Sequence, residues 1–161
     1  MQPVPTGRTE TLEQQSASNR ESLSPASKPL HRILVVEDDR DLRRLNAEAL
    51  TFYGYHVDAA EDGALALERL GEQSYDLMIT DNRMPNMTGV ELLKELHAKS
   101  QKIPTVMASS EVPTGEFQKH PWLEPAAFLT KPYTVMELVE KVRKILGAQT
   151  NGRSRAALAV A

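Results

Sequence analysis

Four short apolar runs in the sequence are each followed by polar side chains that are suited to ionic chemistry. These side chains are Glu37 with Asp38, then Asp81, Ser109 and Lys131. In a parallel sheet the carboxyl ends of the strands meet at one edge, so these groups would converge. Carboxylates that repel one another favour a hard divalent cation, which indicates Mg²⁺, with Mn²⁺ as an alternative. A carboxylate nucleophile beside such an ion, a hydroxyl and an ammonium has the components of phosphoryl transfer.

The elements that would position these groups alternate between strand and helix. Continuous apolar runs at 33–36, 77–80 and 105–108 are typical of strands buried on both faces, and further strands are expected at 56–60 and 128–130. Helical spacing is seen in four apolar sets: Leu42, Leu45, Ala49 and Phe52; 63–70; Val90, Leu93 and Leu96; and Val135, Leu138, Val139, Val142, Ile145 and Leu146. The alternation predicts an α/β fold with a doubly wound, five-stranded parallel sheet.

The segment between the fourth and fifth strands departs from this regular pattern. Residues 110–125 contain Pro113, Gly115, Pro121 and Pro125, which leave space for only a turn or two of helix. We therefore expect the fourth helix to be short or irregular.

Composition divides the chain into three parts. Residues 1–30 are polar and rich in proline, without hydrophobic periodicity, and predict a disordered N-terminal leader. Residues 31–147 form the predicted folded domain, and 148–161 a flexible C-terminal tail. The 15 residues that follow Leu146 are too few for an output domain, which predicts a stand-alone domain.

Charge and composition argue against two classes of partner. The net charge of the chain is −3, and residues 31–146 carry 19 acidic and 14 basic side chains, so direct binding to nucleic acid is not expected. No apolar run approaches the roughly 18 residues that a membrane span needs, so no membrane insertion is expected. The chain has no cysteine, which fits a reducing compartment, and we predict a cytoplasmic protein.

Four motifs at the predicted strand ends resemble those of the response-regulator receiver family of two-component signalling. They lie at 35–40, 81–89, 104–109 and 128–132. The resemblance covers about 32–146 and implies a flavodoxin-like (βα)5 fold. It also implies a signalling protein that is not an enzyme on external substrates and catalyses only its own phosphorylation and dephosphorylation.

The resemblance implies a phosphoacceptor and a metal site. Asp81 is similar to the phosphoacceptor of the family, which takes a phosphoryl group from a histidine kinase or a phosphotransfer protein. Glu37 and Asp38 are similar to the acidic pair that holds Mg²⁺, together with Asp81 and the backbone carbonyl of Arg83. A downstream protein partner is implied as well.

The resemblance also implies a phosphoryl-binding lysine and a switch. Lys131 would bind the phosphoryl oxygens, and its peptide bond to Pro132 is similar to one that is usually cis. Ser109 matches the hydroxyl of the switch, although Ser110 is one register step away, and Phe128 matches the switch aromatic. A pairing of Arg83 with Glu111 over the site would hinder water and lengthen the lifetime of the phosphoryl group.

Simpler interpretations exist for each motif alone. The acidic run 37–39 would also suit the N-terminus of a helix. Asp81 could be an ordinary turn residue, and Lys131 could be a solvated surface lysine. The agreement of four motifs favours the switch. A constitutive interaction module, which an irregular 110–125 segment would suit, is the alternative. A phosphohydrolase ranks last, because such enzymes would have a second aspartate where Arg83 stands.

Overall fold

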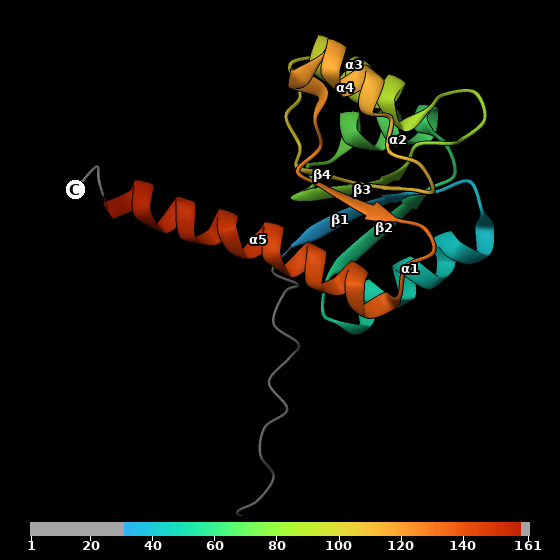
Figure 1. Ribbon diagram of the computed structural model, residues 1–161. Coiled ribbons are helices and arrows are strands. Elements are labelled where there is room, and N and C mark those ends of the chain that lie inside the picture. The colour runs from blue at the N-terminus through green and yellow to red at the C-terminus, as the bar shows by residue number, and fades with distance from the viewer. Residues whose placement is uncertain (1–30, 159–161) are drawn as a thin grey trace, which may run out of the picture.

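Strands and helices alternate throughout the described part of the chain, residues 31–158 of the computed structural model (Figure 1). In chain order the elements are β1 (Arg32–Val36), α1 (Arg40–Phe52), β2 (His56–Ala60), α2 (Gly63–Glu72), β3 (Leu77–Asp81), α3 (Gly89–Ala98), β4 (Thr105–Ser109), α4 (Thr114–Lys119), the 3₁₀ helix η1 (Pro121–Leu123), β5 (Ala127–Thr130) and α5 (Val135–Leu158). The leader predicted at 1–30 lies outside the described residues, as do residues 159–161 of the predicted tail.

The five strands form one sheet in which every pairing is parallel. The strand order is β2-β1-β3-β4-β5, which confirms the predicted doubly wound α/β fold. Helices α1 and α5 lie on one face of the sheet, and α2, α3 and α4 lie on the other (Figure 1). Because all strands run in one direction, their carboxyl ends share one edge of the sheet.

The side chains of β1 alternate between two cores, one on each face of the sheet. Ile33 and Val35 pack with Leu50 of α1 and with side chains of α5. Leu34 and Val36 pack on the opposite face, against α2 and α3. A strand that is buried on both faces needs an apolar residue at every position, which explains its continuous apolar run.

The buried face of α1 differs from the predicted one. The sequence placed Leu45 and Phe52 on the apolar stripe, but their exposed fractions are 50% and 85%. The helix instead buries Asn46 and Leu50, which are four residues apart and share one face. The prediction was wrong because a polar residue interrupts this stripe in the sequence.

The helix between β4 and β5 is short, as the prolines predicted. α4 has six residues and is followed by the three residues of η1, so a regular three-turn helix is not formed. The ring of Phe117 in α4 packs against that of Phe128 in β5, with centroids 5.4 Å apart. Lys94 Nζ of α3 lies 2.8 Å from Glu116 Oε2, so α4 is tied to its neighbours by an apolar and an ionic contact.

Helix α5 is longer than expected. It continues to Leu158, beyond the boundary predicted at Gly147. Glycine within a helix costs only about 1 kcal/mol relative to alanine, and the sequence after it is rich in alanine. None of the helices in the described part of the chain has the length and apolarity needed to cross a bilayer.

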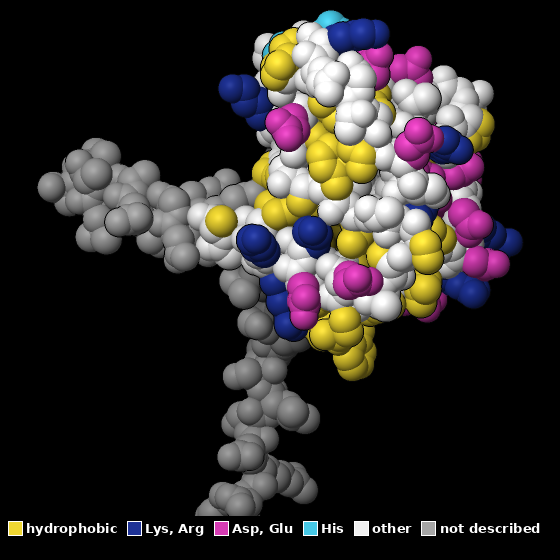
Figure 2. All heavy atoms as spheres, viewed as in Figure 1, with side chains coloured by type: hydrophobic (Ala, Val, Ile, Leu, Met, Phe, Trp, Pro, Cys, Tyr) yellow, Lys and Arg dark blue, Asp and Glu magenta, His cyan; other side chains and the backbone are white. Residues whose placement is uncertain are grey.

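Charged side chains of both signs are mixed on the face drawn in Figure 2, where Lys and Arg lie among Asp and Glu. An ion pair links the edge strand β2 to β1: Arg32 Nε and Nη2 each lie 2.7 Å from Asp58 Oδ2. Partial burial alone would raise the pKa of the Asp58 carboxyl, but the hydrogen bond and charge of Arg32 leave it below its ordinary value.

This ion pair should make stability depend on pH. A carboxyl whose pKa is lowered by folding stabilises the protein above its unfolded pKa, about 3.9, and that contribution is lost as pH falls through the folded pKa. We expect Asp58→Asn to cost about 1 kcal/mol near neutral pH and progressively less below about pH 4. Thermal melts of wild type, Asp58→Asn and the exposed control Glu72→Gln would show this. A difference between wild type and Asp58→Asn that stays constant with pH would contradict it.

Candidate functional site

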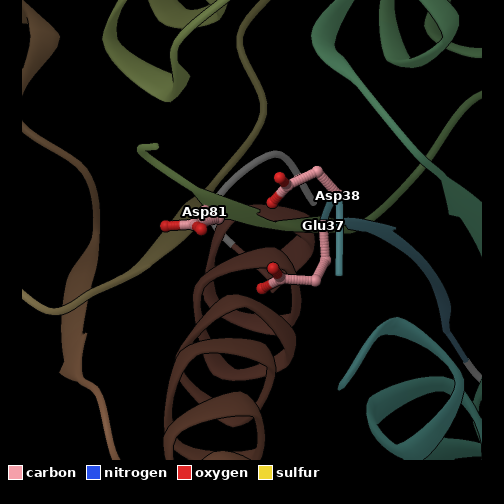
Figure 3. A group of neighbouring side chains, drawn as sticks. All are labelled: Glu37, Asp38 and Asp81. Carbon is pink, nitrogen blue, oxygen red and sulfur yellow. The ribbon is translucent and has the colours of Figure 1, made fainter. Parts of the chain in front are cut away.

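The ends of β1 and β3 bring three carboxylates together. Val36 pairs with Thr80 in the sheet, so the next residues, Glu37 and Asp81, lie side by side. Carboxylate oxygens of Glu37, Asp38 and Asp81 all lie within 4.8 Å of one another. Figure 3 shows the three side chains approaching from the two strand ends. The predicted convergence of these acids is confirmed.

Lys131 completes the cluster from the end of β5. Its Nζ donates hydrogen bonds to Glu37 Oε2 at 2.8 Å and to Asp81 Oδ2 at 2.9 Å. Its backbone N–H donates to the carbonyl oxygen of Ser109 at 3.0 Å, which aligns the segment after β5 with the end of β4. The ammonium therefore bridges acids that come from two different strands.

Burial and charge control the protonation of this cluster. Burial raises the pKa of the Glu37 carboxyl and the nearby charge of Asp81 raises it further, while Lys131 opposes both effects. Burial alone would lower the pKa of the Lys131 ammonium, but its hydrogen bonds to Glu37 and Asp81 raise it above the ordinary value. The lysine is thus held in its charged form beside Asp81.

The donor set suits a hard divalent cation. Three carboxylates face a single ammonium in the cluster, and all the candidate metal ligands are oxygen atoms. Asp38 is exposed, whereas Glu37 and Asp81 are buried, so the cluster opens to solvent on one side. Mg²⁺ commonly binds to one or two carboxylates and keeps several waters, which fits a half-open acidic site of this kind.

The remaining predicted residues surround this cluster. Ser109 ends β4 and is buried, whereas Ser110 is exposed. The Oγ of Ser109 accepts a hydrogen bond from the N–H of Glu111 at 3.4 Å. Phe128 packs against Phe117 and, among the contacts of the described residues, has none with the carboxylates. In the described part of the chain, neither Ser109 nor Phe128 makes a hydrogen bond to the three carboxylates.

Arg83 contacts Asp81 through its backbone and Glu111 through its side chain. Its N–H donates to Asp81 Oδ1 at 3.2 Å. Its guanidinium lies 2.8 Å from Glu111 Oε2, so the predicted pairing of these two charges is confirmed. The peptide bond between Lys131 and Pro132 is cis, as the resemblance implied.

Arg43 of α1 is a site residue that the sequence did not reveal. Its Nη1 donates to the carbonyl oxygen of Glu37 at 2.6 Å and to that of Asp38 at 3.1 Å. These bonds fix the backbone that carries the acidic pair. Carbonyl oxygens belong to every residue, so no side-chain pattern in the sequence indicates such a contact.

The fold and the acidic site together define a receiver of two-component signalling. The profile of the family described as the response regulator receiver domain matches residues 33–143, and the chain belongs to this family. The response regulator receiver protein CpdR of Brucella abortus is 36% identical over 119 residues, which cover 73% of this chain and 98% of that protein. MprA of Mycobacterium ulcerans is 32% identical over 117 residues, and there the match spans about half of the relative (50%).

Solved structures show the same fold. The response regulator TrrA of Thermotoga maritima, determined in complex with Mg²⁺-BeF, superposes with a TM-score of 0.62 at 31% identity, covering 72% of this chain and 99% of that chain. The chemotaxis response regulator CheY4 of Vibrio cholerae superposes with a TM-score of 0.65 at 28% identity, covering 71% and 98%.

Proposed function

We propose that this receiver accepts a phosphoryl group on Asp81 and that phosphorylation switches its protein–protein contacts. The observation that carries this proposal is the contact of Asp81 with Lys131, inside a cluster of three carboxylates at the switch point of the sheet. The donor would be the phosphohistidine of a histidine kinase or a phosphotransfer protein. A downstream protein would recognise the phosphorylated form.

The transfer is a displacement at phosphorus. An oxygen of the Asp81 carboxylate attacks the phosphorus atom, the new P–O bond forms, and the bond from phosphorus to the donor nitrogen breaks. The imidazole leaves with the bonding electron pair and takes up a proton. Lys131 places its positive charge where negative charge gathers on the phosphoryl oxygens. Hydrolysis of the acyl phosphate by water returns Asp81 and releases phosphate.

The acidic residues would hold the metal ion for this reaction. Glu37, Asp38 and Asp81 offer carboxylate oxygens, and we propose the backbone carbonyl of Arg83 as a further ligand. Bound Mg²⁺, or Mn²⁺ in its place, supplies positive charge that offsets the charge of the phosphoryl group. Arg43 holds the backbone of the acidic pair in place.

Ser109 and Phe128 are proposed as the switch. Ser109 ends the strand next to β3, and its Oγ accepts the weak hydrogen bond from the N–H of Glu111 at 3.4 Å. Its own O–H can therefore donate a hydrogen bond to a phosphoryl oxygen. Phe128 packs on Phe117 of α4, so a change in its position would alter the surface formed by α4. Phosphorylation would act by shifting the balance between two arrangements of this region.

Intact mass spectrometry after incubation with acetyl phosphate tests the proposal. Wild type should gain the mass of one phosphoryl group only when Mg²⁺ is present, and Asp81→Asn should gain none. Asp41→Asn makes the same chemical change at an exposed position of α1 and should behave as wild type. If wild type gains no mass, the proposal fails and a constitutive interaction module becomes the better description.

Removing the ion pair beside the site should shorten the lifetime of the phosphoryl group. Arg83 and Glu111 have side chains that are 69% and 75% exposed, and exposed ion pairs contribute about 0.2–1 kcal/mol. If the pair hinders approach of water, Arg83→Ala should speed dephosphorylation by about 1.4- to 5-fold. Glu111→Ala should have a similar effect, and the double variant should add little more.

The decay of the phosphorylated protein, followed by intact mass after removal of the donor, measures these rates. Arg44→Ala, at an exposed position of α1, is the matched control. Equal decay rates in wild type and Arg83→Ala would remove this role of the pair without affecting the proposal for Asp81.

A further inference from the structure

A buried hydrogen bond joins α1 to the segment that follows Lys131. The side-chain amide of Asn46 donates through Nδ2 to the hydroxyl oxygen of Tyr133 at 2.8 Å, and the two residues are 87 positions apart. Asn46 is only 2% exposed, and Tyr133 is partly buried against the core on this face of the sheet. A buried amide without a hydrogen-bond partner is costly, so Tyr133 is what makes an asparagine tolerable on this helix face.

The Tyr133 hydroxyl lies near the charges of the site. Burial is the main reason that its pKa is raised, and the hydrogen bond from Asn46 partly opposes this. The positive charge of Lys131 lowers the pKa of the same hydroxyl. The negative charges of Glu37 and Asp81 raise it. The charges of Lys131, Glu37 and Asp81 thus all act on the pKa of this hydroxyl.

The backbone around Lys131 is consequently held from two sides. On the sheet side, its N–H donates to the carbonyl oxygen of Ser109 at 3.0 Å. On the helix side, Tyr133 follows two residues later and is fixed to Asn46 of α1. A flexible lysine side chain can bridge Glu37 and Asp81 only if its own backbone stays in place.

We propose that Asn46 and Tyr133 are positioning residues for Lys131. Their hydrogen bond holds the segment after β5 against α1, so that the ammonium meets both carboxylates. The same helix carries Arg43, one turn earlier, which grips the carbonyl oxygens of the acidic pair. One face of α1 thus positions both the acidic pair, through Arg43, and Lys131, through Asn46. The expected slowing of phosphorylation rests on the proposed function, but the positioning of the Lys131 ammonium does not.

Two variants separate positioning from simple stabilisation. Tyr133→Phe keeps the ring and removes the hydroxyl, which leaves the buried amide of Asn46 without its partner. The double variant Asn46→Leu with Tyr133→Phe replaces both polar groups by apolar ones, a change that is often nearly neutral for stability. We expect Tyr133→Phe to lower Tm by about 5 °C and the double variant to recover most of that loss.

Acylation by acetic anhydride reports whether Lys131 is in place, and it requires no phosphoryl transfer. Peptide mass spectrometry measures the acylation of Lys131 relative to that of the exposed Lys102. A lysine whose Nζ is hydrogen-bonded to two carboxylates and whose side chain is only 17% exposed is reached slowly by the reagent. We expect several-fold faster acylation of Lys131 in both variants, including the double variant with recovered Tm. Labelling is carried out well below the Tm of each variant, so global unfolding does not contribute, and Lys102, which is exposed in the folded protein, corrects for differences in reagent.

Phosphorylation by acetyl phosphate is the second readout. We expect both variants to react about tenfold more slowly than wild type, as a displaced catalytic group does. If the double variant regains wild-type acylation and phosphorylation along with its Tm, the hydrogen bond is merely structural and the inference is overturned. If wild type itself accepts no phosphoryl group, the proposed function fails, and the labelling of Lys131 alone decides whether Asn46 and Tyr133 position it.

Discussion

Lys131→Met should accept a phosphoryl group from acetyl phosphate at least about 100-fold more slowly than wild type. Methionine keeps most of the apolar stem but removes the ammonium that lies 2.9 Å from Asp81 Oδ2. Negative charge on the phosphoryl oxygens then loses a fixed cation at the place where it gathers. Stopped incubations followed by intact mass spectrometry, in saturating Mg²⁺, measure the rate. A rate equal to that of wild type would exclude Lys131 from the reaction.

The same variant should also be less stable when no divalent ion is present. Glu37 and Asp81 are 3% and 7% exposed, and they would face each other without the ammonium between them. Removing one partner of a buried ion pair costs about 3–5 kcal/mol, and protonation of Glu37 relieves part of that, so we expect a loss of about 2–3 kcal/mol.

Urea unfolding with and without Mg²⁺ separates the two roles of the lysine. Mg²⁺ should restore part of the lost stability, because an ion that binds only the folded state stabilises it. The rate defect should remain in saturating Mg²⁺. Lys102→Met, at an exposed lysine, is the matched control and should change neither quantity appreciably. Unchanged stability of Lys131→Met without Mg²⁺ would show that the carboxylates do not need this partner.

The acidic half of the site could be predicted because parallel strands impose a common geometry. Each buried strand appears in the sequence as a continuous apolar run, and the residue that follows it must lie at the carboxyl edge of the sheet. Glu37 and Asp81 are adjacent for this reason alone, through the register of β1 and β3. The start of α3 follows local rules as well, since Thr88 and Glu91 form a capping box there.

Contacts between side chains that are far apart in the sequence could not be predicted by such rules. The partner of Asn46 lies 87 positions away, and nothing in the local pattern points to Tyr133. Asn46 is a polar residue on the buried face of α1, so a search for apolar residues at helical spacing misses this face. The predicted buried stripe therefore ran through Leu45 and Phe52, which are exposed. The predicted buried face of α1 was rotated by about one residue from the observed one.

The length of α5 was missed for a different reason. Gly147 is a reasonable helix end by propensity, but a single glycine lowers helix stability by only about 1 kcal/mol. The helix continues to Leu158. Proline marks a helix end more reliably than glycine: α5 continues through Gly147 and Gly152, whereas the three prolines around α4 leave it only six residues.

A methyl group added at Gly89 should displace the backbone of Asp81 and so disrupt the site. Gly89 begins α3, and a Cβ at this position would overlap the carbonyl oxygen of Asp81 and lie 3.0 Å from the Cα of Asn82. The backbone here cannot retreat easily, because the N–H of Gly89 donates to the carbonyl oxygen of Asn82 at 3.0 Å. We therefore expect relief of the clash to move the backbone of Asp81, the proposed phosphoacceptor.

We expect Gly89→Ala to lower the free energy of unfolding by about 1–3 kcal/mol, the usual cost of overpacking, and to slow phosphorylation by about tenfold or more. Gly71→Ala is the matched control, since a Cβ there meets nothing within 4 Å and alanine favours the helix by about 0.5–1 kcal/mol. Urea unfolding and phosphorylation by acetyl phosphate measure both effects. Because the overlap is with the Asp81 backbone, the rate of Gly89→Ala should stay low in Mg²⁺ concentrations that saturate wild type. A stable variant with an unchanged rate would mean that α3 can move away from β3 without disturbing the acceptor.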